Sequence, residues 1–324
     1  MTSVEIIQDL ITDYIESQDF TGVPRELYAP IDYTMSQKGK RMRPTLCLLA
    51  CEMFGGDINK CLVPAVSAEI FHNFTLVHDD IMDEAPLRRG LETVYHKWNS
   101  NIALLSGDTM LIKAFQYSLK TDAAHSSDVL NELCKVALEV CEGQQYDLNF
   151  ETINDVTLDE YIEMIRLKTA VLLGSVLKIG AIMADADEQG KKAVYDFGIA
   201  LGIAFQLQDD LFDCYGDVKV FGKLPGGDIA DNKKTYLYLK ALELASDDDK
   251  RRLEDFFKMP KGRDDAKMKA VLEIFDKYNV RQIVTDVMTN YYENSLRHLD
   301  SIALPEERKT VLRNYASSLY NRIK

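Results

Sequence analysis

Apolar residues recur at intervals of three and four along most of this 324-residue chain, which is the spacing of one face of an α-helix. No stretch alternates strictly between apolar and polar residues with turn residues at its ends, so a sheet is not expected. Segment 61–82 is apolar almost all round, as expected of a helix buried inside a bundle. The pattern therefore predicts an all-α fold, with helical segments at 4–18, 42–54, 101–119, 128–148, 158–183, 191–215, 267–299 and 305–322.

The composition favours one domain without a membrane span. Apolar residues make up 46% of the chain, enough for a large core, and charges interrupt the longest apolar runs. Residues 1–20 have the pattern of an acidic amphipathic helix without the basic start of a secretory signal, so we expect a cytoplasmic protein. The six cysteines lie in apolar segments without Cys-x-x-Cys spacing, which predicts buried, reduced thiols. No compositional shift or repeat divides the chain, so we expect a single domain over residues 1–324.

The net charge limits the possible ligands. A formal charge of −14 argues against nucleic-acid binding, because phosphate backbones require a basic surface. A phosphate ligand would therefore need positive charge supplied locally, either by a cluster of basic side chains or by bound cations.

The first chemical signal is an Asp-Asp-x-x-Asp motif at the end of segment 61–82. Asp79 and Asp83 lie four residues apart and share a helix face, with Asp80 beside them. Carboxylates at the C-terminal end of a helix are unfavourable, because the helix dipole is negative there, and a cation would resolve the conflict. Oxygen ligands suit Mg²⁺, which takes one or two carboxylates and keeps positions for water and phosphate. We call Asp79, Asp80 and Asp83 the first aspartate cluster and expect it to bind metal.

The same motif ends another apolar segment, where Asp209, Asp210 and Asp213 form the second aspartate cluster. Aspartate is abundant in this chain, so a repeated motif can also arise without a shared role. Unpaired carboxylates at the ends of strongly apolar helices are costly, however. Their placement favours metal binding for both clusters.

Basic residues follow or precede these clusters. The run Lys38–Pro44 (Lys-Gly-Lys-Arg-Met-Arg-Pro) places three or four cations beside a glycine at the start of an expected helix, where backbone N–H groups and arginine side chains can bind an anion. A solvated turn is the alternative for that run alone. Arg88 and Arg89 follow the first aspartate cluster closely enough to contact the same ligand. Further candidates are Lys168, Lys223 and Lys233, the last two flanking a glycine-rich segment within 216–232 that we expect to be mobile.

Taken in order, these motifs make the chain resemble the trans-isoprenyl (polyprenyl) diphosphate synthase family. The resemblance covers about residues 35–235 and rests on Gly39–Pro44, His72, both Asp-Asp-x-x-Asp motifs, Arg88-Arg89-Gly90, Gly107-Asp108, Lys168-Thr169 and Phe205-Gln206. It implies a bundle of long helices around a deep central cavity, generally dimeric. It also implies a short-chain synthase of the geranylgeranyl or farnesyl diphosphate type.

The resemblance assigns a role to each matching residue. The metal ligands for Mg²⁺, with three ions per active site, would be Asp79, Asp80, Asp83, Asp209 and Asp213. The allylic diphosphate would be contacted by Arg88, Lys168, Lys223 and Lys233, with Thr169 and Gln206 nearby. Isopentenyl diphosphate would be bound by Lys40, Arg43, His72 and Arg89. By itself, His72 is more simply explained as a hydrogen-bonded core histidine, and its place in the ordered motifs favours the binding role.

The chain departs from the family pattern at three positions. Glu92 stands where proline is frequent, Asn232 where glycine is frequent before Lys233, and Tyr95 separates Val94 from His96. None of these changes removes an expected ligand, but they leave the loop contacts less defined.

The implied reaction is ionisation, condensation and elimination. Cations stabilise the departing diphosphate while the allylic C–O bond breaks, and the double bond of isopentenyl diphosphate attacks C1. Loss of a proton, with the released diphosphate as the acceptor, gives a product one isoprene unit longer. In this scheme the aspartates are metal ligands and not proton shuttles.

Product length is expected to depend on the segment just before the first aspartate cluster. Phe74 lies five residues before Asp79, which is roughly 7–8 Å along a helix. In the family an aromatic residue here acts as a floor for the growing chain, with Thr75 beside it and Phe71 one turn deeper. The pattern favours C15–C20 products, with C20 slightly preferred, although ordinary core packing also explains Phe74.

Three other interpretations fit parts of the sequence. A class I terpene cyclase also carries an aspartate motif, but it lacks the basic residues around Lys40 and Arg43. A regulatory subunit of a heterodimeric synthase commonly loses one aspartate motif, and both are present here. A purely structural helical bundle has no need of carboxylates at the ends of its most apolar helices.

Overall fold

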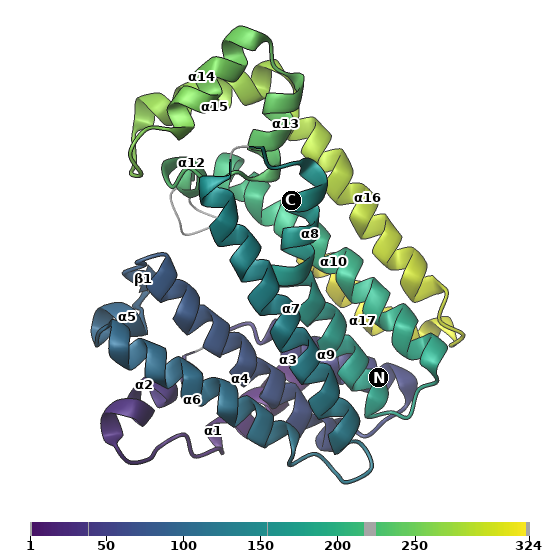
Figure 1. Ribbon diagram of the computed structural model, residues 1–324. Helices are drawn as coiled ribbons and strands as arrows, with labels where there is room; N and C mark the ends of the chain where they lie inside the picture. Colours follow the sequence, from purple (N-terminus) through teal and green to yellow (C-terminus); the bar gives the residue numbers. More distant parts are fainter. Residues whose placement is uncertain (1, 38, 154, 217–224, 322–324) are drawn as a thin grey trace. The chain divides into compact units, whose positions relative to one another are not determined.

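The computed structural model describes residues 2–37, 39–153, 155–216 and 225–321, and these are almost entirely helical (Figure 1). The α-helices are α1 (Val4–Glu16), α2 (Arg25–Met35), α3 (Met42–Phe54), α4 (Ile58–Met82), α5 (Val94–Lys97), α6 (Ser100–Ser118), α7 (Ser126–Thr152), α8 (Leu158–Ile165), α9 (Val171–Ile182), α10 (Glu188–Tyr215), α12 (Gly227–Ala230), α13 (Tyr236–Leu244), α14 (Asp247–Phe257), α15 (Asp265–Lys277), α16 (Val280–Asp300) and α17 (Glu306–Tyr320). A π-helix, η1 (Arg166–Ala170), joins α8 to α9. The predicted all-α fold is therefore confirmed.

Two expected helical segments are interrupted. The segment predicted over 158–183 contains η1, in which the helix widens to π geometry. The segment predicted over 267–299 is two helices, so that expectation was wrong. Asn279 has a left-handed backbone with φ of 54°, which ends α15 before α16 begins. Asparagine tolerates this conformation better than most residues.

The chain forms two compact units. The first unit comprises residues 1–136, 175–195 and 302–315, and the second comprises 137–174, 196–301 and 316–324. The single domain expected from the composition remains a prediction.

In the first unit, α4 packs along α6 and also against α3. Side chains on every face of α4 are buried, from Cys61 near its start to Asp80 near its end. This confirms the prediction of a helix surrounded by other helices. The motif at the end of α4 therefore begins in a buried part of the first unit. Asp57 caps the start of α4 by accepting a hydrogen bond from the backbone N–H of Asn59.

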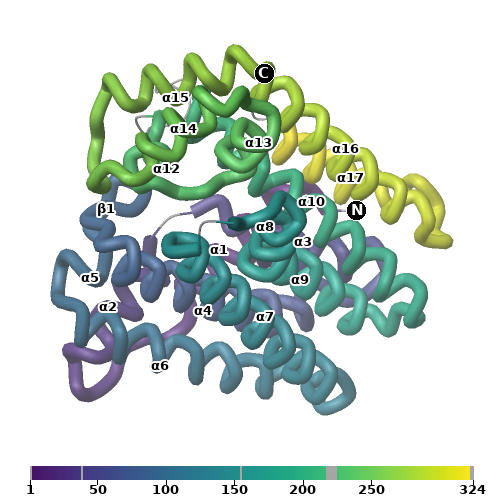
Figure 2. Tube along the Cα trace, turned by 45° about the horizontal axis from the view of Figure 1, so that its top comes forward, coloured from purple at the N-terminus to yellow at the C-terminus, as the bar shows by residue number. Residues whose placement is uncertain are grey.

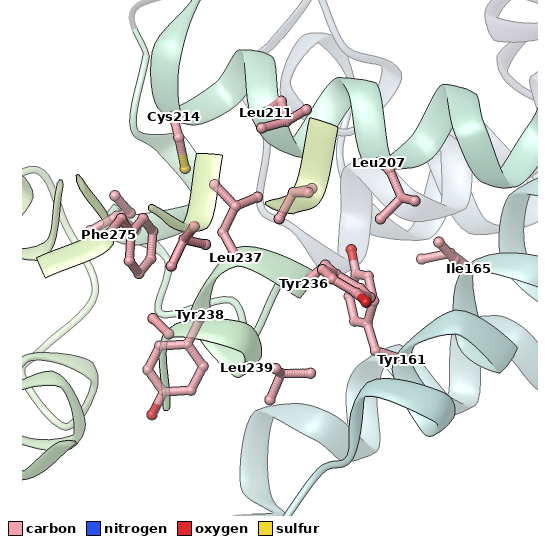
Figure 3. Close-up of a cluster of buried hydrophobic side chains, with 14 of the residues drawn as sticks. Tyr161, Ile165, Leu207, Leu211, Cys214, Tyr236, Leu237, Tyr238, Leu239 and Phe275 are labelled. Atoms are coloured by element: carbon pink, nitrogen blue, oxygen red, sulfur yellow. The ribbon is translucent and has the colours of Figure 1, made fainter. Parts of the chain in front are cut away.

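The second unit has its own core, in which buried side chains of α8 and α10 meet those of α13, α15 and α16. Figure 3 shows part of this cluster, with Leu207 and Leu211 of α10 close to Tyr161 of α8 and Leu237 of α13. The short helices α12, α13 and α14 gather around α15 (Figure 2). Helix α8 starts with a capping box, in which Thr157 and Glu160 each accept a hydrogen bond from the other's backbone N–H.

Two smaller expectations need correction. A two-stranded antiparallel hairpin, β1 (Leu87–Arg88) and β2 (Leu91–Glu92), lies where no strand was expected. Two of the six cysteines, Cys134 and Cys141, are exposed, so buried thiols were the wrong prediction for them. Both lie on the exposed side of α7, which the apolar character of the segment concealed. Among the described residues, no helix is both long and apolar enough to cross a membrane.

Candidate active site

The first aspartate cluster ends α4, as the sequence predicted. Asp79 and Asp80 lie in its last turn, and Asp83 is the C-cap residue. Asp80 is only 4% exposed, and its Oδ1 accepts a 2.8 Å hydrogen bond from Nε of Arg88. Burial raises the pKa of Asp80, as do the charges of Asp79 and Asp83, while Arg88 opposes the rise. The cluster is therefore a set of mutually repelling carboxylates at the negative end of a helix dipole.

The hairpin brings Arg88 to this cluster. Arg89 and Gly90 form its turn, and both have positive φ, 53° and 79°. Two successive positive φ angles match the turn that best joins two short antiparallel strands, and glycine adopts them most easily. The turn reverses the chain directly after Arg88, so that its guanidinium group points back to Asp80.

The run Gly39–Pro44 does not present all its cations in the same way. Arg41 is 8% exposed and turns inward, where Nη1 donates a 2.9 Å hydrogen bond to Oε1 of Glu69. Its Nη2 donates to the carbonyl oxygens of Met35 and Gln37 at 2.8 Å. Arg41 is thus committed to the protein interior, whereas Lys40 is exposed. The predicted binding of an anion by this run therefore concerns Lys40 and Arg43, and not Arg41.

Arg43 and His72 lie in contact, with Nη1 of Arg43 2.9 Å from Nε2 of His72. Arginine can only donate, so Nε2 of His72 is the acceptor and the imidazole is neutral. The pKa of His72 lies well below its ordinary value because the ring is buried and because Arg43, Arg89, Arg88 and Arg41 surround it with positive charge. The histidine therefore orients Arg43 without adding a proton to this basic region.

The second aspartate cluster ends α10. Asp210 is 3% exposed and accepts hydrogen bonds from the hydroxyl of Tyr161 at 2.5 Å and from Nε2 of Gln206 at 3.2 Å. Burial raises the pKa of Asp210 to about 7, helped by Asp209 and Asp213 and opposed by both hydrogen bonds. Asp209, in contrast, is exposed.

Asp213 binds the backbone at Gly226 and Asp228, near the end of the glycine-rich segment. Its Oδ2 accepts a 2.8 Å hydrogen bond from the backbone N–H of Asp228, and its carbonyl oxygen accepts one from the N–H of Gly226. Desolvation and the charges of Asp213 and Asp210 raise the pKa of Asp228 well above the ordinary value, and Lys233 opposes the rise. Asp228 is a residue that the sequence motifs missed, and its only sequence signal was its place between two glycines and Lys233. Lys223 lies outside the described residues.

Lys168 and Thr169 lie in η1. Nζ of Lys168 donates a 2.5 Å hydrogen bond to Oδ2 of Asp147 on α7, a partner that the sequence did not indicate. The hydroxyl of Thr169 donates to Oε1 of Gln206 at 3.0 Å. The backbone of Lys168 passes so close to Gly143 that a Cβ atom there would lie 2.3 Å from the Lys168 nitrogen. Gly143 thus allows α7 and η1 to approach each other.

The residues expected to limit product length are buried in α4. Phe71 is fully buried and Phe74 is 8% exposed, and their ring centroids lie 5.6 Å apart. Phe74 also makes an edge contact with His78, at 4.8 Å between centroids. The hydroxyl of Thr75 donates a 2.8 Å hydrogen bond to the carbonyl oxygen of His72.

The expected site residues divide between the two units. The first unit contains the first aspartate cluster, the hairpin arginines, Lys40, Arg43, His72 and Phe74. The second unit contains the second aspartate cluster with Gln206, Lys168, Thr169 and Lys233. Contacts within the first unit join Asp80 to Arg88, and Arg43 to His72, which lies 29 positions away in sequence. Contacts within the second unit join Thr169 to Gln206 and Gln206 to Asp210.

The donor sets fit Mg²⁺. Within the described residues, no group of three histidine, cysteine, aspartate or glutamate side chains is arranged to hold a metal ion alone. Mg²⁺ does not require such a group, because it binds through one or two carboxylates and completes its shell with water and substrate phosphate. Burial, and to a smaller extent the neighbouring aspartates, raise the pKa values of Asp80 and Asp210. The ionised form of each carboxylate is thus unfavourable as it stands, and a divalent cation would stabilise it.

Comparison with known proteins agrees with this chemistry. A family model described as polyprenyl synthetase matches residues 24–275. The short chain isoprenyl diphosphate synthase of Methanothermobacter thermautotrophicus is 36% identical over 94% of this chain and 93% of its own length. The geranylgeranyl diphosphate synthase of Sulfolobus acidocaldarius is 33% identical over 93% and 90%.

Solved structures that resemble this chain are also prenyl diphosphate synthases. A geranylgeranyl pyrophosphate synthase aligns with a TM-score of 0.95 at 39% identity, over 100% of both chains. The geranylgeranyl pyrophosphate synthetase of Pyrococcus horikoshii aligns with a TM-score of 0.91 at 33% identity, over 98% of each chain. The chain therefore belongs to the polyprenyl synthetase family and is a prenyltransferase of the short-chain trans-isoprenyl diphosphate synthase type.

Proposed function

We propose that this enzyme condenses isopentenyl diphosphate with an allylic diphosphate, head to tail and in trans, and releases diphosphate. We expect a C20 product in preference to C15. The observation that carries the proposal is that a carboxylate cluster ends a long helix in each unit, with a basic side chain near each. In the first unit Arg88 bonds Asp80. In the second, the charge of Lys233 acts on Asp228, which contacts Asp213. The names of the relatives, mainly geranylgeranyl diphosphate synthases, support the C20 preference.

We assign the metal sites to the two aspartate clusters, with three Mg²⁺ ions per active site. When bound, Mg²⁺ supplies the positive charge that stabilises a departing diphosphate. Asp80 is bonded to Arg88, so it would bind Mg²⁺ once Arg88 turns away from it and contacts the substrate phosphate instead. Asp210 would be held in place by Tyr161 and Gln206.

Basic side chains would bind and orient the allylic diphosphate. We assign Arg88, Lys168 and Lys233 to this task, together with Lys223, and place Thr169 and Gln206 beside them. Lys168 is held by Asp147, which keeps its ammonium group at a defined position. The positive charges lower the energy of the diphosphate as the allylic C–O bond breaks.

Isopentenyl diphosphate would be bound by Lys40, Arg43, His72 and Arg89. Its double bond then attacks C1 of the allylic cation, and the proton that leaves passes to the released diphosphate. The neutral state of His72 suits a role in orienting Arg43 and not one in proton transfer.

We further propose that the protein is a homodimer. Leu105 and Ile112 of α6 and its C-cap residue Leu119 are spaced seven residues apart and are 57%, 55% and 59% exposed. Residues seven apart lie on the same face of a helix, so these form one apolar stripe. A second copy of the chain is a suitable partner for such a stripe.

A direct assay tests the activity. Purified protein would be incubated with Mg²⁺, labelled isopentenyl diphosphate and, in turn, dimethylallyl, geranyl or farnesyl diphosphate, and the products sized by chromatography. We expect elongation that stops mainly at C20 and that ends when the metal is chelated. Absence of chain growth with every primer would contradict the proposal. Hydrocarbon formed from an allylic diphosphate alone would instead indicate a terpene cyclase.

A further inference from the structure

Two basic residues at the start of α3 pair with two residues on one face of α4. Arg41 binds Glu69 and Arg43 contacts His72, each at 2.9 Å. Glu69 and His72 are three residues apart on α4, and residues at that spacing lie on the same face. The loop that contains Lys40 and the start of α3 are therefore fixed to α4 at two neighbouring points.

The first of these points is ionic and buried. Arg41 and Glu69 have side chains that are each 7% exposed. Arg41 has a left-handed backbone with φ of 44° and is the N-cap residue of α3. The same guanidinium group also holds the end of α2 and the following turn, through the carbonyl oxygens of Met35 and Gln37. Arg41 thus joins three segments, and its only charged partner among the described contacts is Glu69.

A cavity of about 390 Å³ adjoins this loop, lined by the polar residues Glu16 and Gln37 and by the apolar residues Ile15, Phe20 and Met35, as well as by Gly39 and Arg41. The loop is therefore not fully packed on that side, and the hydrogen bonds and charge of the Arg41–Glu69 pair contribute to its position.

The negative charge of Glu69 also offsets the positive charges of Arg41 and Arg89. Its charge opposes the fall in the pKa of Arg89 that desolvation, Arg88 and Arg41 cause. Without a negative charge at this position, Arg41 and Arg89 would repel each other across the start of the loop.

We propose that Glu69 is a positioning residue for isopentenyl diphosphate, because it anchors Arg41 and, through it, the loop that carries Lys40 and the first turn of α3 that carries Arg43. The inference rests on the proposed function of Lys40, Arg43, His72 and Arg89. Glu69 itself does not touch the substrate. It sets the spacing of the cations that do.

The test is Glu69→Gln, which keeps the shape of the side chain and removes its charge. We expect the KM for isopentenyl diphosphate to rise about 10- to 100-fold, as displaced binding groups cause, while the KM for the allylic diphosphate changes little. If Glu69 acted only through its charge, the substitution would change this KM in the opposite direction. Removal of a negative charge would strengthen binding of an anionic substrate and lower the KM for isopentenyl diphosphate, and that result would overturn the proposal.

The matched control is Glu132→Gln in the same unit. Glu132 is 5% exposed and accepts hydrogen bonds from Lys178 Nζ at 2.6 Å and from Ser175 at 2.8 Å. It is thus a buried, ion-paired carboxylate away from the loop. We expect this variant to lower the melting temperature without changing the ratio of the two KM values. If Glu69→Gln lowers stability and leaves that ratio unchanged as well, the proposal is wrong.

A second variant covers the case in which Glu69→Gln does not fold. Arg41→Lys keeps the positive charge beside Glu69 but cannot reach all three acceptors with one planar group. We expect a selective rise in the KM for isopentenyl diphosphate here too, and an unchanged KM would overturn the proposal. A wild-type enzyme that extends no primer would contradict the proposed function itself, which distinguishes the two failures.

Discussion

The hydroxyl of Tyr161 donates a 2.5 Å hydrogen bond to Oδ2 of Asp210, and both residues are buried in the second unit. The bond stabilises the charged carboxylate and opposes the burial that raises the pKa of Asp210 to about 7. Tyr161 therefore has a defined task, which is to keep Asp210 ionised and correctly oriented.

Replacing Tyr161 with phenylalanine should weaken metal binding by the second aspartate cluster. Asp210 would keep only Gln206 as a hydrogen-bond partner, so its ionised form would be less favourable. We expect the Mg²⁺ concentration for half-maximal activity to rise about 10-fold, which is typical for loss of an outer partner of a metal ligand. Tyr238→Phe is the control, because Tyr238 is a buried tyrosine of the same unit that stacks on Phe257. Equal metal requirements in both variants would contradict the role given to Tyr161.

Replacing Phe74 with alanine should lengthen the product. Removal of the ring would leave space just beyond the first aspartate cluster, so the chain could grow past C20 before it stops. The destabilisation should be about 3–5 kcal/mol, as for other buried phenylalanines. Chromatography of the products is the measurement. Phe275→Ala, a buried change in the second unit, should cost similar stability without altering product length. An unchanged C20 product would show that Phe74 only packs the core.

Replacing Gly143 with alanine should disturb η1. A Cβ atom would lie 2.3 Å from the backbone nitrogen of Lys168 and 2.7 Å from its Cα, and backbone atoms cannot rotate away as side chains can. We expect a loss of about 1–3 kcal/mol in the free energy of unfolding, the usual cost of overpacking. We also expect a higher KM for the allylic diphosphate, because Lys168 would be displaced. A stable variant with wild-type kinetics would exclude this close contact.

The second unit should lose stability in acid partly through Asp249. Hydrogen bonds from Lys277 and Tyr278 lower the pKa of Asp249 to about 2, from an ordinary value of 3.8. A lowered pKa means that the contribution to stability is present above the unfolded pKa and is lost as the pH falls toward 2. The melting temperature of Asp249→Asn should therefore lie below that of the wild type at pH 6, with the difference shrinking toward pH 3. A constant difference would contradict this assignment.

Introducing a charge into the apolar stripe of α6 should dissociate the proposed dimer. Ile112 is 55% exposed in the single chain and lies at the centre of the stripe. Ile112→Glu should therefore give a species of half the wild-type mass by sedimentation, since burying an unpaired carboxylate in an interface is unfavourable. Gln189→Glu, an exposed position on α10 in the same unit, serves as the control. A wild-type protein that is already monomeric would rule out the dimer.

The helices were predictable from the sequence because apolar periodicity records which faces are buried. Segment 61–82 shows this well, since apolar side chains on all faces predicted a surrounded helix and α4 is one. The break at Asn279 was missed because periodicity continues through it, and a single left-handed residue is a local backbone event. An asparagine at that position was a weak signal.

Side-chain direction was the main property that the sequence did not show. Arg41 and Arg43 are indistinguishable in the basic run, yet the first turns to Glu69 and the second to His72. Asp147 and Asp228 were missed for a similar reason. Their contacts with Lys168 and with Asp213 join segments 21 and 15 residues apart, and only folding brings these together.

The uneven burial of the cysteines makes the protein selectively reactive. Cys47, Cys51, Cys61 and Cys214 are buried, whereas Cys134 and Cys141 are exposed. A thiol reagent should therefore modify the native protein at the last two positions, which are two turns, or about 10 Å, apart along α7. Fluorescent or spin labels could be attached there without any substitution, and the appearance of further reactive thiols would report unfolding around α3 and α4 or at the end of α10.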